Sequence, residues 1–250
     1  MSVRSETELI REIERLRAEL SEREREAAAK ERQLERYAAD LRESFKRERT
    51  RAHELRRSYT EMVRALSNAV EARDAYTGKH AERVAAYGLE IAYALGLRLT
   101  ERPDLEYGFL LHDVGKVAIP DSILYKPSTL TDEERALMEQ HPVIGAQIVS
   151  GIEFIDQAIE VVRSHHERWD GHGYPDALAG EEIPQSARVF AVADVLDALT
   201  TDRPYRPASS LTVAREMIAR ESGSHFDPEV VEAFDSVTDE TFERIATRIG

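Results

Sequence analysis

The stretch LLHDVGKVAIP, residues 110–120, places ionisable side chains inside an apolar run. His112 and Asp113 interrupt the run, and Lys116 follows about one helical turn later. A charged group taken out of water is costly unless a partner compensates its charge. An ion pair, a capped helix end or a bound metal ion would each provide that compensation, and the rest of the sequence indicates which one applies.

Composition limits the classes of protein to consider. The 250 residues are enough for one or two domains, and 33% charged residues beside 42% hydrophobic ones indicate a globular domain joined to a solvated segment. A net charge of −14 argues against a DNA-coating protein but allows a small phosphorylated ligand in a local pocket. The absence of cysteine excludes disulfides, thiolate zinc sites and cysteine nucleophiles. With no signal peptide and no apolar run of membrane-spanning length, we expect a cytoplasmic protein without a membrane partner.

The charge is concentrated near the N-terminus. Residues 1–58 are rich in Arg and Glu and contain neither Gly nor Pro. A seven-residue frame is mostly apolar at Ile13, Leu20, Ala27, Leu34, Leu41, Leu55 and Met62, whereas the positions three residues later are mostly polar. This is half of a coiled-coil seam, although a solvated helix held by Glu–Arg pairs is an alternative. We predict a coiled-coil segment over residues 1–64 that forms a homodimer, followed by a separate domain over residues 65–250.

The second part of the chain is predicted to be all-α. β-branched alternation is scarce, and amphipathic segments are broken by Gly and Pro. Thr131 and Glu134 have the spacing of a capping box, and Pro103 suits a first helical position. Helices are expected over residues 81–97, 103–116, 131–141, 155–166, 186–200, 213–221 and 227–237.

Histidines and aspartates recur beside the apolar faces of these helices. The residues concerned are His112, Asp113, His141, His165, His166, Asp194 and Asp197. Any one of them alone is best explained as a hydrogen-bonded core residue or an ion-pair partner. Together, pointing inward from separate helices, they would need a shared compensating charge, which divalent metal ions supply. Imidazole and carboxylate ligands suit Fe, Mn, Zn or Ni, and Asp113 can bridge two ions with one oxygen on each.

A two-metal site indicates a reaction class. Two ions about 3.5–4 Å apart suit phosphoester hydrolysis, because they lower the pKa of a shared water and bind phosphoryl oxygens. Such a reaction also needs a proton donor for the leaving oxygen. Lys116 could serve, or it could instead be a cation that stabilises a helix C-terminus.

Six stretches now identify a resemblance. They are DAYTGKHAERV (74–84), LLHDVGKVAIPDSIL (110–124), HPVIGAQIV (141–149), HHERWDGHGYP (165–175), GEEIPQSARVFAVADVLDALTTDRPYRP (180–207) and SHFDPEVVEAF (224–234). In this order they resemble the HD-GYP family of the HD phosphohydrolase superfamily, over about seven-tenths of the chain. An HD dipeptide alone is a weak signal, but the ordered set is specific.

The resemblance implies a helical HD-type domain that hydrolyses cyclic di-GMP to linear pGpG, and in many members on to GMP, through a metal-bridged hydroxide. It implies one metal ion at His80, His112, Asp113 and Asp194, and a second at Asp113, His141, His165 and His166. Fe or Mn is expected first, with Zn and Ni as alternatives. It also implies catalytic roles for Asp113 and Lys116, and substrate contacts from Tyr174, Asp197, Arg203 and Arg206.

Three positions depart from the family pattern. Members with a third metal carry Glu where this chain has Tyr76, so a two-metal site is expected. Arg206 is a lysine in some members, and Ala177 stands where a glycine is frequent. No matched metal position is missing, which favours an active enzyme. A non-catalytic module that senses cyclic dinucleotides and an HD phosphohydrolase acting on another nucleotide are the alternatives.

Overall fold

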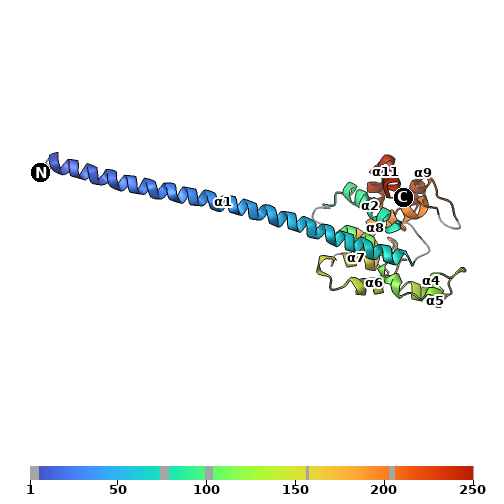
Figure 1. Ribbon diagram of the computed structural model, residues 1–250. Helices are drawn as coiled ribbons and strands as arrows, with labels where there is room; N and C mark the ends of the chain where they lie inside the picture. Colours follow the sequence, from blue (N-terminus) through green and yellow to red (C-terminus); the bar gives the residue numbers. More distant parts are fainter. Residues whose placement is uncertain (1–5, 74–78, 99–103, 156–157, 203–205, 250) are drawn as a thin grey trace. The chain divides into compact units, whose positions relative to one another are not determined.

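Helices form the whole architecture of the described residues. The computed structural model describes residues 6–73, 79–98, 104–155, 158–202 and 206–249 (Figure 1). Over these ranges it contains no strand, only one isolated bridge between Ser222 and Phe226. The predicted all-α class is therefore confirmed. The chain divides into two compact units, residues 1–58 and 59–250, so the division lies slightly before the predicted one at residue 64.

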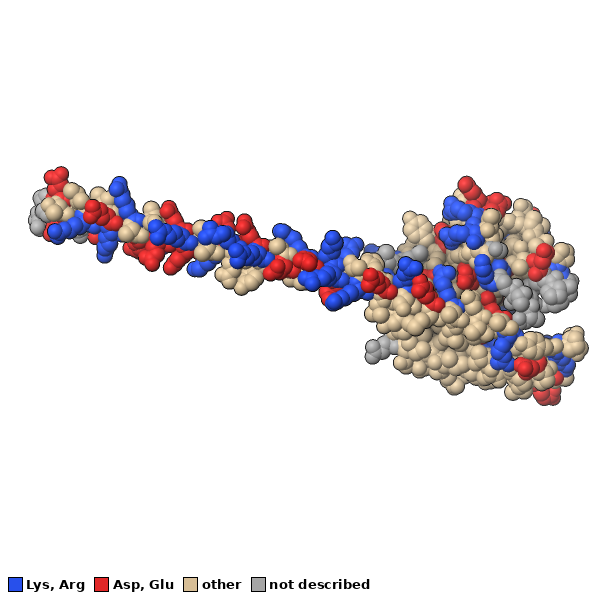
Figure 2. Space-filling model, in the orientation of Figure 1, with Lys and Arg blue, Asp and Glu red and all other residues tan. Residues whose placement is uncertain are grey.

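Helix α1, Glu6–Glu71, includes all described residues of the first unit. Ion pairs three or four residues apart follow its surface, such as Arg15–Glu12 at 2.7 Å and Arg23–Glu19 at 3.0 Å, and both signs of charge alternate along it (Figure 2). Each such exposed pair contributes about 0.2–0.5 kcal/mol to helix stability. The apolar residues of the predicted seam, including Ala27, are exposed to solvent. No helix in the described ranges combines the length and apolar character needed to span a bilayer.

The second unit is a bundle of short helices. Its helices are the end of α1, α2 (His80–Ala94), α3 (Asp104–Leu111), η1 (Val114–Ala118), α4 (Asp121–Leu124), α5 (Asp132–Met138), α6 (His141–Val149), η2 (Glu153–Ile155), α7 (Ala158–Ser164), η3 (Gly180–Glu182), α8 (Gln185–Thr200), α9 (Leu211–Arg220), α10 (Pro228–Ser236) and α11 (Asp239–Ile249). Helix α8 packs against α2, α7 and α9, and α3 packs between α2 and α7. Phe109 and Phe190 are fully buried at 5.6 Å between ring centroids, so the α3 and α8 faces share one core.

Several predicted helices end earlier than their apolar pattern suggested. Helix α3 stops at Leu111, so that His112 and Asp113 lie in a turn, and α7 stops at Ser164, before His165. The predicted helix over residues 131–141 also ends early, because Pro142 has no N–H with which to continue it. The physical cause of the first two breaks is in the histidine side chains, as described below.

A close approach of two backbones fixes the turn after Asp113. η1 packs against the start of α6, and a Cβ on Gly115 would lie 1.9 Å from the carbonyl oxygen of His141 and 2.6 Å from the amide nitrogen of Gly145. Only glycine fits there. Gly115 therefore brings the Asp113 turn and the first residue of α6 together.

The last two turns of α1 belong to the second unit and bond to the backbone beside these turns. The contacts are Ser67 Oγ donating to the Leu110 carbonyl at 2.7 Å, Arg73 Nη1, just after α1, donating to the Val117 carbonyl at 2.6 Å, and Glu71 Oε1 accepting from the Ala81 amide at 2.6 Å. Leu110 and Val117 flank the segment from His112 to Lys116, and Ala81 follows His80. The end of α1 thus supports two turns that carry predicted ligands.

Candidate metal centre

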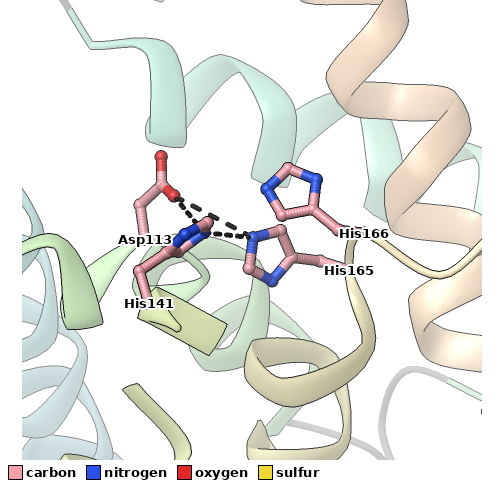
Figure 3. A group of neighbouring side chains, drawn as sticks. All are labelled: Asp113, His141, His165 and His166. Atoms are coloured by element: carbon pink, nitrogen blue, oxygen red, sulfur yellow. Dashed lines mark hydrogen bonds and ion pairs between the residues drawn. The ribbon is translucent and has the colours of Figure 1, made fainter. Parts of the chain in front are cut away.

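All seven predicted metal ligands lie in two groups of neighbouring side chains. The donor atoms of Asp113, His141, His165 and His166 lie within 4.8 Å of one another (Figure 3), and so do those of His80, His112 and Asp194. We call the first group, Asp113, His141, His165 and His166, the imidazole cluster. We call the second group, His80, His112 and Asp194, the carboxylate cluster. The residues come from five separate places in the chain, and four of those places are helix ends or the turns that follow them.

Three histidines are oriented by the carbonyl groups of the helices that have just ended. Their Nδ1 atoms contact carbonyl oxygens three residues earlier, namely His112 with Phe109 at 2.9 Å, His141 with Met138 at 2.8 Å, and His165 with Val162 at 2.9 Å. A carbonyl oxygen only accepts hydrogen bonds, so each Nδ1 must carry the proton. The imidazoles satisfy carbonyls that a longer helix would have paired, and each leaves an Nε2 lone pair toward the cluster.

The imidazole cluster fits a cation better than a proton. His141 Nε2 and His165 Nε2 lie only 3.1 Å apart, and with both Nδ1 atoms protonated their lone pairs face each other. Burial and the neighbouring histidines lower the pKa of His165 well below its usual range and that of His166 to about 3. Protonation is therefore unfavourable, and neutral imidazoles are the form that binds metals. A divalent ion would remove the repulsion.

Asp113 lies between the two clusters. Its Oδ1 is 3.2 Å from His141 Nε2, and its Oδ2 is 3.0 Å from His112 Nε2 and 2.8 Å from Lys116 Nζ. Burial alone would raise its pKa, but the charges of His112 and Lys116 hold the pKa well below the usual range of a carboxyl group. The carboxylate is thus an anion with one oxygen toward each cluster, as a bridging ligand requires.

The carboxylate cluster is built around His80, the first residue of α2. Its Nε2 lies 3.4 Å from Asp194 Oδ1, and its Nδ1 lies 2.7 Å from Asp197 Oδ2. Burial lowers the pKa of His80, but the hydrogen bond to Asp197 and the charge of Asp194 together raise it to about 9. Both ring nitrogens of His80 thus face carboxylates, while its ring packs edge-on against the ring of His112.

Asp197 corrects one prediction. It was expected to face the substrate, but its side chain is only 2% exposed and its two oxygens bond to His80 and Arg83. The one-turn spacing from Asp194 places it on the α8 face toward α2, behind His80. Asp197 therefore supports a predicted ligand instead of meeting substrate.

Tyr174 lies beside the imidazole cluster. Its ring stacks on His166 with centroids 4.6 Å apart and planes 28° apart. The preceding Gly173 has no room for a Cβ, which would lie 2.4 Å from the Arg168 amide nitrogen. Buried Glu167 holds the loop by accepting hydrogen bonds from the backbone amides of Asp176 at 2.7 Å and Leu178 at 3.1 Å. The loop thus fixes Tyr174 at the edge of the cluster.

Arg206, another predicted substrate contact, bonds to the backbone of α8 in this structure. Arg206 Nη2 donates to the Ala198 carbonyl near the end of α8, and no described group accepts from its buried Nε. Arg203 and Tyr76 lie outside the described residues. Ala177 keeps a positive φ of 53°, so the turn retains a left-handed residue without glycine. His172, which sequence reasoning left out of the metal set, is 80% exposed and belongs to neither cluster.

Sequence reasoning missed two residues that orient the site, Arg83 and Glu167. Both are charged residues with little exposure, at 7% and 3%. A signal existed for Arg83, because it interrupts the apolar side of residues 81–97 three positions after His80, on the same helical face. Glu167 stands in a polar loop, where a buried carboxylate cannot be distinguished from an exposed one.

Comparison with known proteins now places the chain. The HD domain family matches residues 64–230, which contain every residue of both clusters. The chain belongs to the HD domain family. Within that family the HD-GYP resemblance of the six motifs is confirmed by relatives that are named cyclic di-GMP phosphodiesterases.

Two relatives from Vibrio cholerae illustrate the match. A 3'3'-cGAMP-specific phosphodiesterase 2 is 44% identical over 181 residues, which are 72% of this chain and 35% of that protein. A cyclic di-GMP phosphodiesterase is 45% identical over 197 residues, 73% of this chain and 40% of that protein. The HD chain therefore spans less than half the length of these relatives.

A solved structure confirms the HD-domain fold. It is the crystal structure of a cyclic GMP-AMP-specific phosphodiesterase of Vibrio cholerae, V-cGAP3, with a TM-score of 0.55 and 23% identity. The match covers 74% of this chain and 52% of that one. At this identity the likeness supports the fold alone. The clusters of histidines and aspartates in the HD domain fit a divalent metal site.

Proposed function

We propose that this HD domain is a metal-dependent phosphodiesterase that hydrolyses cyclic di-GMP to pGpG and then to GMP. One observation carries the proposal: Asp113 directs one oxygen to each of two donor clusters while Lys116 contacts the same carboxylate. Isolated core histidines would not need this arrangement. Each cluster supplies only nitrogen and oxygen donors, as expected for hydrolytic metal centres without cysteine.

The residues divide the work of hydrolysis. Two divalent ions, Fe or Mn first, would supply Lewis acidity to the phosphoryl group and activate the attacking water. Hydrolysis adds water across the P–O3' bond: the water oxygen binds phosphorus, and the leaving 3'-oxygen takes a proton. Lys116 holds protons at Nζ, 2.8 Å from Asp113 Oδ2, and we assign it the proton that the leaving oxygen takes.

Substrate positioning falls to residues around the imidazole cluster. Tyr174 presents an aromatic ring beside His166, a suitable surface for stacking a guanine base. Arg203 and Arg206 are proposed to bind phosphate oxygens, since guanidinium groups form paired hydrogen bonds with phosphates. For Arg206 this requires the guanidinium to exchange its bond to the Ala198 carbonyl for one to the substrate.

A second candidate substrate is 3'3'-cGAMP. A relative named for that substrate is 44% identical to this chain, and a relative named for cyclic di-GMP is 45% identical. Overall identity therefore does not discriminate between the two substrates. The two compounds differ at one base only, so they test the base pocket and not the metal centre.

The decisive experiment is purification without oxygen, elemental analysis, and incubation with cyclic di-GMP, 3'3'-cGAMP or cyclic di-AMP. We expect two metal ions per chain and chromatographic conversion of cyclic di-GMP to pGpG and GMP. Faster conversion of 3'3'-cGAMP would replace the proposed substrate. Tight binding of a dinucleotide without any product would instead indicate a sensing module and overturn the enzymatic assignment. The variant His172→Ala is the matched control, because it removes a histidine outside both clusters.

We further propose that α1 pairs with a second copy of the chain. Leu34 and Leu41 of the seven-residue frame are exposed, and a second helix would cover them. Sedimentation at tens of micromolar should give a dimer, which Leu34→Glu with Leu41→Glu should dissociate. Ala39→Glu is the matched control, because Ala39 is exposed on α1 outside the frame. A monomeric native chain would contradict the pairing.

A further inference from the structure

We propose that Arg83 is a positioning residue for the carboxylate cluster: acting through Asp197, it holds His80 with its Nε2 atom directed at Asp194. The proposal rests on the proposed function, since it concerns the same metal centre. It assigns a role to Arg83, a buried cation whose described side-chain contacts include Asp197 and Thr201.

Two nitrogens of the Arg83 guanidinium group donate hydrogen bonds to the Asp197 carboxylate. Its Nε donates to Asp197 Oδ1 at 2.6 Å, and its Nη2 donates to Asp197 Oδ2 at 3.1 Å. The Nη2 group also lies 3.4 Å from Thr201 Oγ1. Both partners of this ion pair are buried, with side-chain exposures of 9% and 2%. A two-point contact of this kind fixes the rotation of the carboxylate as well as its position.

Asp197 passes that orientation on to His80. Its Oδ2 accepts from Arg83 and lies 2.7 Å from His80 Nδ1, so one oxygen serves both donors. With Nδ1 held by Asp197, Nε2 lies on the opposite side of the ring and is directed at Asp194 Oδ1, 3.4 Å away. The Asp197 carboxylate thus orients the ring so that Nε2 is the nitrogen available to a metal ion.

His80 needs this support because it lacks the backbone carbonyl contact that orients three of the other histidines. His112, His141 and His165 each donate to a carbonyl three residues earlier. His80 begins its helix after Lys79, which has a φ of 62°, and its Nδ1 contacts a side chain instead. That side chain belongs to α8, the helix that also carries Asp194. The Arg83–Asp197 pair therefore fixes the α2 ligand relative to the α8 ligand.

The proposal predicts a site-selective loss of metal affinity. Removing an outer partner of a metal-binding histidine lowers metal affinity by about 10–100-fold. Arg83→Met should therefore weaken one of two Mn²⁺ sites by about 10–100-fold and leave the other unchanged, as measured by calorimetric titration of the metal-free chain. Arg83→Lys keeps the charge but loses the two-point contact, and it should restore part of the affinity.

A matched control separates positioning from folding. Arg188 forms a comparable buried ion pair with Asp227 at 2.5 Å, and its other partners, Ile183 and Trp169, belong to neither cluster. Arg188→Met should lower the unfolding temperature while both Mn²⁺ affinities stay at the native values. Equal losses at both sites in Arg83→Met, or unchanged affinity at both, would overturn the proposal.

Two further outcomes are distinguishable. If Arg83→Met does not fold, Arg83→Lys takes its place, and native affinity at both sites in that folded variant would count against the positioning role. The titration needs no substrate, so it can succeed in a chain that hydrolyses no cyclic dinucleotide. That result would overturn the proposed function and retain the role of Arg83.

Discussion

The two clusters share Asp113 but differ in depth and in donor type. In the imidazole cluster the side chains of His141 and His165 are 1% and 0% exposed, whereas in the carboxylate cluster those of His80 and Asp194 are 20% and 29% exposed. Three imidazoles form the deeper cluster, and two imidazoles with Asp194 form the shallower one. An ion at His141 and His165 would therefore be less exposed to solvent than one at His80 and Asp194.

The same contrast appears in the protonation of histidine. Burial and neighbouring imidazoles lower the pKa of His166 to about 3, whereas His80, also buried, has a pKa raised to about 9 by Asp197 and Asp194. One residue type thus shifts in opposite directions within one centre. The direction depends on whether carboxylates near the ring outweigh the effect of burial.

Removing the shared residue should have the largest effect. Asp113→Ala deletes the only carboxylate of the imidazole cluster and the contact to His112. We expect both metal ions to be lost and turnover to fall by more than about 100-fold, since even outer-shell partners cost 10–100-fold. Elemental analysis and chromatography of products measure both effects. Native metal content with native turnover would refute the shared role of Asp113.

A variant of Lys116 tests the role of the contact between this lysine and Oδ2 of Asp113. Lys116→Ala should lower turnover by about 100-fold, the lower range for loss of a general acid. Metal content should stay near two ions per chain, because Lys116 contacts the carboxylate and offers no donor to a metal. Loss of metal in this variant would mean that the lysine maintains the centre rather than supplying a proton.

Gly115→Ala should disturb the imidazole cluster selectively. The added Cβ would lie 1.9 Å from the His141 carbonyl, which forces η1 away from α6 and costs about 1–3 kcal/mol of stability. Urea unfolding measures that cost, and metal titration should show a weaker deep site. Gly151→Ala is the control: at a φ of +86° it also strains the backbone and lowers stability, but its Cβ would meet nothing within 4 Å, so both metal sites should keep their affinity. Equal weakening of both sites would contradict this selectivity.

Metal removal should separate the clusters in time. Since His80 and Asp194 are more exposed than His141 and His165, a chelator should remove one ion quickly and the second slowly. Elemental analysis of samples taken during dialysis against a chelator would resolve the two phases. Loss of both ions in a single phase would show that the difference in burial does not govern release.

Residue types predicted that inward-facing histidines and aspartates would meet, and the family resemblance supplied the set of seven residues whose donor atoms the structure brings into two groups. Sequence did not predict that His112 and His165 follow helix ends, since the apolar period continues past Leu111 and Ser164 while the imidazoles take the carbonyls. Pro142 was a readable signal for the break before α6. The substrate contact expected of Asp197 came from the resemblance, and nothing in the sequence indicated its buried bonds to His80 and Arg83, because helical spacing gives a face but not the neighbour on that face.

The bonds from the end of α1 decide where the working part of the chain can be shortened. Ser67 and Glu71 satisfy the Leu110 carbonyl and the Ala81 amide, which lie close in the chain to His112 and His80, two ligands of the carboxylate cluster. Deleting residues up to Ser58 leaves these bonds in place, whereas cutting after Glu71 removes them. The last turns of this helix thus support the metal site, and a shortened protein that omits them would lack contacts that hold two of its ligand-bearing turns.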